Sequence, residues 1–172
     1  MGVSPWVQEF SSGTSREVVI ANGNILETLL SRNFRHEVSS PNHHRERLYE
    51  YTGGIVRNIN GAMIEIGGIE DHVHMLINLT PSRAVADIVR DLKSNSAKWM
   101  NDLPEVRDRF EWQKGYSVFT VSYSQVDPVR TYIRDQKEHH RTATFKEEYI
   151  EFLKRHDIEF KPEYLFEQEH HA

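Results

Sequence analysis

The segment 72–79 constrains the fold of this chain more than any other part of the sequence. Its side chains alternate as on a β-strand, where successive residues point to opposite faces. One face is wholly apolar and is expected to pack into the core: Val73, Met75, Ile77 and Leu79. His72 and His74 lie on the other face and point the same way. A strand of this kind can offer two imidazole ligands to one metal ion while its back packs against helices.

The flanking sequence predicts helices and further strands around this one. Gly67-Gly68 and the acidic pair after it predict a turn from the preceding strand, and periodic apolar residues predict amphipathic helices. Ser124 followed by Asp127 resembles a capping box. The predicted elements are a helix over 44–60, a strand beginning at 63–66, the strand 72–79, a helix over 82–101, a strand clearest at 116–121, a helix from 124 to about 140, and a helix over 146–155.

This order predicts an α+β fold of the ferredoxin-like kind, with an antiparallel sheet and helices packed on one face. The other face of the sheet would stay open for a ligand. Residues 1–44 give weaker signals: a short strand at 18–21 and a helical turn or two at 25–30. We therefore expect an atypical segment over 1–44 and a catalytic domain over 45–168.

Composition narrows the function classes. The 172 residues are 38% hydrophobic and 27% charged, as in one soluble globular domain. Cysteine is absent, which excludes disulfides and thiolate ligands. The sequence has no apolar run of membrane-spanning length and no secretory signal pattern. We expect a cytoplasmic protein with no membrane association.

A tyrosine and an amide add to the histidine pair. Tyr132 and Gln136 stand four residues apart, on one face of the predicted helix. Two imidazoles and one amide oxygen form a mixed ligand set that suits a divalent ion such as magnesium or manganese. Tyr132 could then attack a phosphodiester that the metal activates. Taken singly, each residue has a plainer interpretation as core or surface, and His139-His140 are expected at a solvated helix end.

A net charge of −5 weakens the long-range attraction of this chain to nucleic acid, but a local basic face can still bind phosphate. Several basic residues follow one predicted helix or flank the tyrosine. The candidates for DNA binding are Arg83, Arg90, Lys93, Lys98, Arg130 and Arg134.

These motifs, in this order, resemble the HUH single-tyrosine transposases of small bacterial insertion sequences and the related repeat-associated tyrosine transposases. The resemblance covers about residues 45–168. The stretches that carry it are 48–55, 68–76, 89–99, 112–116, 122–126, 132–136 and 145–148.

The resemblance implies a ferredoxin-like fold and a homodimer in which each site borrows the tyrosine helix of the partner subunit. It implies recognition of single-stranded DNA hairpins, cleavage to a 5′-phosphotyrosine with a free 3′-hydroxyl, and rejoining. His72, His74 and Gln136 match the metal ligands of the family, and Tyr132 matches its nucleophile. The family opens with a long central strand, and residues 1–44 show nothing comparable beyond 18–21.

Other functions remain open at this stage. The chain could be an inactive relic that binds DNA hairpins, or a domesticated endonuclease that processes genomic repeats. A metal enzyme acting on a small molecule is a further alternative. A histidine-triad nucleotide hydrolase is excluded, because Leu76 stands where the next alternating histidine would be.

Overall fold

The computed structural model describes residues 8–12, 15–20, 25–33, 41–79, 83–107, 109–113, 115–142 and 144–155. The chain divides into two compact units, residues 1–137 and residues 138–172. The strands are β1 (Gln8–Ser12), β2 (Ser15–Ile20), β3 (Ile25–Asn33), β4 (Ala62–Gly68), β5 (His72–Asn78), β6 (Glu111–Trp112) and β7 (Tyr116–Thr120). The helices are α1 (Pro41–Asn58), α2 (Val85–Asn101), the short 3₁₀ turn Tyr123–Gln125, α3 (Val126–Arg134), α4 (Gln136–His139) and α5 (Phe145–Arg155).

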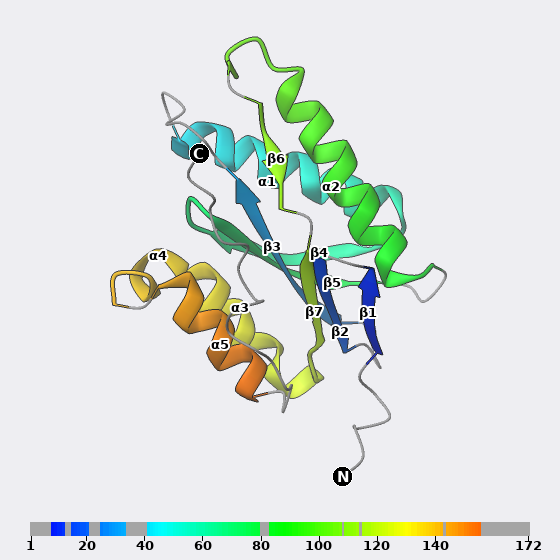
Figure 1. The fold of residues 1–172 in the computed structure, drawn as a ribbon, viewed down its shortest axis with the longest axis vertical. Coiled ribbons are helices and arrows are strands. Elements are labelled where there is room, and N and C mark those ends of the chain that lie inside the picture. The colour runs from blue at the N-terminus through cyan, green and yellow to red at the C-terminus, as the bar shows by residue number, and fades with distance from the viewer. Residues whose placement is uncertain are drawn as a thin grey trace. The chain divides into compact units, whose positions relative to one another are not determined.

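The sheet of the first unit has the ferredoxin-like topology that the sequence predicts (Figure 1). Along the chain, β3, α1, β4, β5, α2 and β7 form the order βαββαβ. Their four strands lie side by side as β7-β3-β5-β4, and every neighbouring pair is antiparallel. β2 adds to β7 in parallel, and β1 pairs with β2 at the outer edge.

The expectation of a helical turn at 25–30 is wrong, because this segment lies within β3. β3 is central: it pairs with β5 along Ile25–Ser31 and with β7 along Leu26–Leu29. Leucine and glutamate favour helices locally, but hydrogen bonding to two neighbouring strands overrides that propensity. Residues 25–33 thus supply the central strand that segment 1–44 had been expected to lack.

The apolar face of β5 packs under α1 and α2, as predicted. Val73, Met75 and Ile77 are buried there, together with Val118 of β7. The helices contribute Val56 from α1 and three residues from α2, namely Ile88, Val89 and Leu92. None of the helices in the described ranges is long and apolar enough to cross a membrane.

The opposite face of the sheet is less open than expected, because α3 lies against β4 and β5 (Figure 1). Ile133 of α3 is buried against Leu76 of β5 and Val121. The predicted capping box is wrong: the residue before α3 is Gln125, whose side chain makes no capping hydrogen bond. Instead, the 3₁₀ turn leads directly into the first turn of α3. At the other end of the helix, a break at Asp135 separates α3 from α4.

Gly67 allows α3 to approach β4 closely. A Cβ atom at this position would lie 2.3 Å from the carbonyl oxygen of Ile133, well inside van der Waals contact. The chain at Gly67 therefore packs directly against the backbone of α3, and no larger side chain fits without displacing that helix.

Charge adds a second attachment of α3 to β4. The carboxylate of Glu65 on β4 accepts hydrogen bonds from Arg130 Nε at 3.2 Å and from Arg134 Nη2 at 2.8 Å. Partial burial acts to raise the pKa of Glu65, but the hydrogen bonds and positive charges of Arg134 and Arg130 outweigh it and hold the pKa below its ordinary value. These arginines stand two residues on either side of Tyr132, so the contact helps to set the position of the tyrosine.

Replacement of Gly67 by alanine should displace α3 and destabilise the protein. We expect Gly67→Ala to lower the free energy of unfolding by about 1–3 kcal/mol, the usual cost of overpacking. Gly53→Ala is the matched control, because a Cβ there meets only Arg57 Nη1 at 3.7 Å and should stabilise α1 by up to about 1 kcal/mol. Urea unfolding measures both. Equal stability of Gly67→Ala and the wild type would contradict the close approach.

The contact of Glu65 with the two arginines should show in the pH dependence of stability. The folded-state pKa of Glu65 lies below its unfolded-state value of about 4.3, so its contribution is present above that pH and is lost as the pH falls through the folded pKa. Glu65→Gln should cost less than about 1 kcal/mol at pH 7, because the arginines are partly exposed.

Urea unfolding at pH 7 and pH 3 tests this expectation, with Glu50→Gln on the exposed surface of α1 as the control. The difference between Glu65→Gln and the wild type should shrink at the lower pH. A difference that grows on acidification would show that the carboxylate does not hold α3.

Candidate functional site

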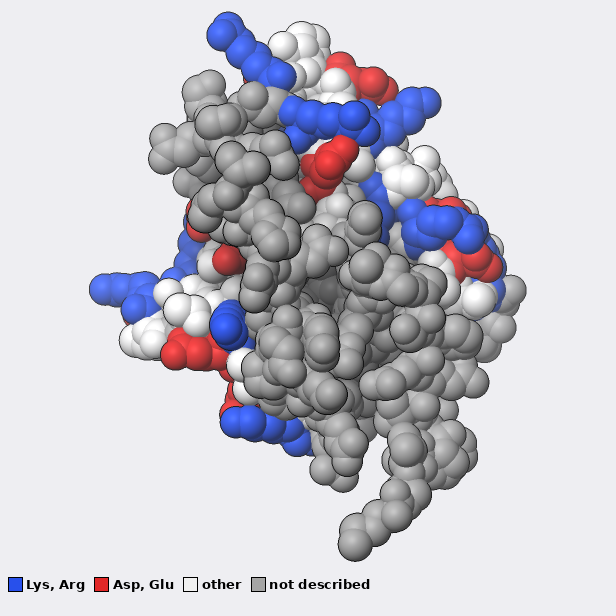
Figure 2. Space-filling model, in the orientation of Figure 1, with Lys and Arg blue, Asp and Glu red and all other residues white. Residues whose placement is uncertain are grey.

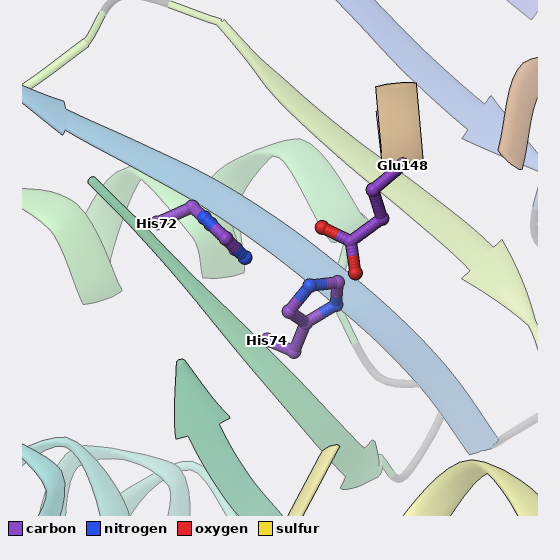
Figure 3. Close-up of side chains that lie close together, drawn as sticks. All are labelled: His72, His74 and Glu148. Carbon is purple, nitrogen blue, oxygen red and sulfur yellow. The ribbon is translucent and has the colours of Figure 1, made fainter. Parts of the chain in front are cut away.

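The two histidines of β5 form the centre of the candidate site. Their side chains project from the same face of the strand (Figure 3), as the alternation predicts. Both are buried, with exposed fractions of 0% for His72 and 1% for His74. Their ring centroids are 5.1 Å apart and the rings are nearly perpendicular, at 81°. The pairing of β5 with β3 and β4 fixes this arrangement.

Gln136 and Tyr132 lie beside the histidine pair of the same chain. Oε1 of Gln136 is 3.1 Å from Nε2 of His72, and the glutamine is 1% exposed. The ring of Tyr132 meets that of His74 edge to face, with centroids 5.6 Å apart. All four residues belong to the first compact unit. The resemblance implies a tyrosine helix donated by a partner subunit, whereas α3 here meets the histidines of its own chain.

Asp71 orients the first histidine. Its Oδ1 lies 2.6 Å from Nδ1 of His72, so a proton on Nδ1 is donated to the carboxylate. This tautomer leaves the Nε2 lone pair directed toward Gln136. Asp71 was not among the site residues predicted from the sequence, although a carboxylate directly before a candidate ligand was a usable signal.

The donor set fits a divalent metal ion. In the neutral imidazole that metal binding requires, with the proton on Nδ1, Nε2 of His72 and Oε1 of Gln136 both offer lone pairs and stand 3.1 Å apart. That separation is close to the edge between neighbouring ligands of an octahedral ion with bonds of about 2.1 Å. A cation between two such acceptors would compensate their mutual repulsion.

Arg45 supports the turn that precedes the histidines. Its buried guanidinium donates from Nη2 to Glu70 Oε1 at 2.7 Å and lies near the carbonyl oxygen of Gly68. Since Gly68–Asp71 leads into β5, this arginine of α1 ties the start of β5 to the helical layer. Arg45 was not predicted from the sequence, because one arginine in an amphipathic helix carries no distinguishing pattern.

The predicted basic residues are largely engaged with acidic or carbonyl partners. Arg83 pairs with Asp91 and Arg90 with Asp87, while Lys93 donates to the carbonyl oxygens of residues 113 and 115. Arg130 and Arg134 share Glu65, as described for α3. In the region of α2, Figure 2 accordingly shows blue and red side chains next to one another.

Lys98, the sixth candidate, is exposed on α2. It lines a groove of about 700 Å³ between α2 and β6, together with Arg90, Lys93 and Arg109. Three of the six candidates for DNA binding therefore share one groove, and the pair on α3 lies on another element.

Two proteins of known sequence are similar to parts of this chain. Over 71 residues the chain is 34% identical to the ISDra2 transposase TnpA of Deinococcus radiodurans, an alignment covering 38% of this chain and 51% of that protein. Over 116 residues it is 29% identical to the transposase of insertion sequence element IS200 from Salmonella typhimurium, covering 60% and 76% of the two chains. The chain thus aligns with about half the length of the first relative.

Solved structures show the same fold. A crystal structure from Deinococcus radiodurans, described as that of a transposase, superposes with a TM-score of 0.51 at 20% identity and covers 79% of this chain and 97% of its own. The structure of a REP-associated tyrosine transposase bound to a REP hairpin superposes with a TM-score of 0.53 at 12% identity and covers 70% of each chain.

The sequence profile of IS200-like transposases matches residues 24–136, more than half of the chain. The match begins just before β3 and ends at Gln136, so it spans the central strand, the histidine pair and the tyrosine helix. The chain belongs to the IS200-like transposase family.

Proposed function

We propose that this protein cleaves and rejoins single-stranded DNA through a covalent 5′-phosphotyrosine at Tyr132. The observation that carries the proposal is the meeting of the half-buried Tyr132 with the buried side chains of Gln136, His72 and His74. Family membership supports DNA strand transfer as the reaction class. The proposed metal ligands are His72, His74 and Gln136, and the proposed ion is magnesium or manganese.

The proposed reaction exchanges one phosphodiester for another in two steps. The phenolic oxygen of Tyr132 loses its proton and attacks phosphorus, the bond from phosphorus to the 3′ oxygen breaks, and that oxygen takes up a proton as a free 3′-hydroxyl. Rejoining reverses the exchange: a 3′-hydroxyl attacks the phosphotyrosine and the tyrosine regains its proton. One phosphodiester replaces another at each step, so no external energy source is required.

Other residues of the site orient Tyr132 and His72. His74 packs edge to face against the tyrosine ring and restricts where the phenol can point. Asp71 fixes the ring of His72. When bound, a divalent ion supplies a Lewis acid that polarises a phosphoryl oxygen.

The proposed substrate is a DNA hairpin with a single-stranded flank. Support comes from the fold shared with the REP-associated transposase, whose structure contains a REP hairpin. We assign phosphate contacts to Arg83, Arg90, Lys93, Lys98, Arg130 and Arg134. A homodimer is part of the proposal, but the juxtaposition of Tyr132 with the histidine pair is complete within one chain.

The decisive test is formation of a covalent adduct between the protein and labelled single-stranded DNA. The DNA is taken from the ends of the insertion sequence. With manganese or magnesium, the wild type should give a slower band on a denaturing gel, and Tyr132→Phe should abolish it. Tyr123→Phe is the matched control, because Tyr123 lies close in sequence but is 88% exposed and should keep full activity. An adduct that persists in Tyr132→Phe would exclude this nucleophile.

Hairpin binding distinguishes the alternatives in the same experiment. Binding without an adduct in the wild type would indicate an inactive relic that retains DNA recognition. The absence of both hairpin binding and an adduct would exclude a DNA substrate of this kind.

The role of Gln136 can be tested by the metal dependence of the adduct. Gln136→Leu removes an oxygen donor while keeping a side chain of similar size, so the manganese concentration for half-maximal adduct should rise at least about tenfold. Gln125→Leu, on the exposed side of the 3₁₀ turn, should leave that concentration unchanged. An unaltered manganese requirement in Gln136→Leu would remove the glutamine from the ligand set.

A further inference from the structure

A second group of side chains that could ligate a metal lies in the unit formed by residues 138–172. Nε2 of His140 is 3.1 Å from Oε2 of Glu148, and Nε2 of His139 is 3.8 Å from Oε1 of the same carboxylate. The ring centroids of the two histidines are 5.1 Å apart. One ligand atom from each of the three residues lies within 4.8 Å of the others.

The burial of this group differs from the sequence expectation. His139 and His140 were expected at a solvated helix end, but the side chain of His140 is only 4% exposed and that of Glu148 only 2%. A buried carboxylate is costly unless a positive charge compensates it. Either protonated histidine or a bound cation can supply that charge.

Local structure fixes the position of the carboxylate before any ligand arrives. At the start of α5, the backbone N–H of Thr144 donates to Glu147 Oε2 at 2.8 Å, and the N–H of Glu147 donates back to Thr144 Oγ1 at 3.3 Å. This reciprocal capping box sets the first turn of α5. Glu148 follows directly and faces His139, the last residue of α4, and His140, which comes after it.

We propose that His139, His140 and Glu148 form a second divalent-metal site that ties α4 to α5. The donor set of two imidazoles and one carboxylate suits a borderline transition ion such as zinc, whereas magnesium and calcium prefer oxygen ligands throughout. Ligands of one zinc ion stand about 3.3 Å apart at bond lengths of about 2.0–2.1 Å. The separations of 3.1 and 3.8 Å bracket that value, so small side-chain rotations complete the site.

The test measures zinc binding to the full chain after the first site has been removed. The starting variant carries His72→Ala and His74→Ala, and also His170→Ala and His171→Ala to remove terminal histidines. Equilibrium dialysis against Zn²⁺ should still find one bound equivalent. Because this variant lacks the proposed catalytic ligands, the result is independent of whether the chain forms a phosphotyrosine.

Further substitutions in this variant locate the ion. His139→Gln and Glu148→Gln should each raise the Kd for Zn²⁺ at least about tenfold, since even the loss of an outer-shell partner lowers metal affinity by that factor. Glu151→Gln is the matched control, because Glu151 lies on the same helix, is 56% exposed and pairs with Arg155. Its Kd should be unchanged.

His139→Gln separates a metal site from a buried ion pair. The side chain of His139 is 36% exposed and stands farther from the carboxylate than His140, so its removal should disturb a simple His140–Glu148 ion pair little. If circular dichroism shows that Glu148→Gln does not fold, the Kd of His139→Gln alone decides between a metal site and an ion pair. No bound zinc in the starting variant, or a Kd unaffected by His139→Gln, would overturn the proposal and leave protonated histidine as the compensating charge.

Discussion

The pairing of β5 on both of its edges is the constraint on which the candidate site depends. β3 holds one edge and β4 the other, so the strand cannot slide without breaking two ladders. A shift of one residue would exchange the two faces of β5 and bury Val73 and Met75 on the wrong side. The apolar contacts with α1 and α2 therefore determine, from the opposite face, where His72 and His74 point.

The second requirement is that α3 lies directly on the sheet. Gly67 permits backbone contact with Ile133, and Glu65 pairs with the two arginines that flank Tyr132. Apolar contact of Ile133 with Leu76 fills the space between these points. The three interactions act on one short helix from three positions, which explains how α3, only nine residues long, can place a tyrosine ring against His74.

Sequence alone predicted the parts of this fold in which periodicity is strong. The alternation along β5 identified both its core face and its histidine face, and the apolar stripe of α2 identified that helix, although it begins at Val85 rather than at residue 82. β3 escaped prediction because its leucines and glutamate carry helical propensity, and only pairing with strands 40 or more residues away in sequence makes it a strand.

The residues of the candidate site also fall into those that the sequence predicts and those that it does not. Tyr132 and Gln136 could be selected from the sequence because four-residue spacing places them on one side of a helix, although the structure divides that helix at Asp135. Asp71 and Arg45 act through contacts with His72 and Glu70, and Glu65 acts on residues 65 or more positions away. Such partners follow from the packing of elements, which no local pattern encodes.

The charge distribution limits how DNA can be held. The chain carries a net charge of −5, and five of the six basic candidates already contact carboxylates or carbonyl oxygens. A phosphate that recruits Arg130 or Arg134 must compete with Glu65, and doing so would loosen the attachment of α3 to β4. DNA contact at these arginines would thus be coupled to the position of Tyr132, because the same carboxylate pairs with both arginines and anchors the helix that carries the proposed nucleophile.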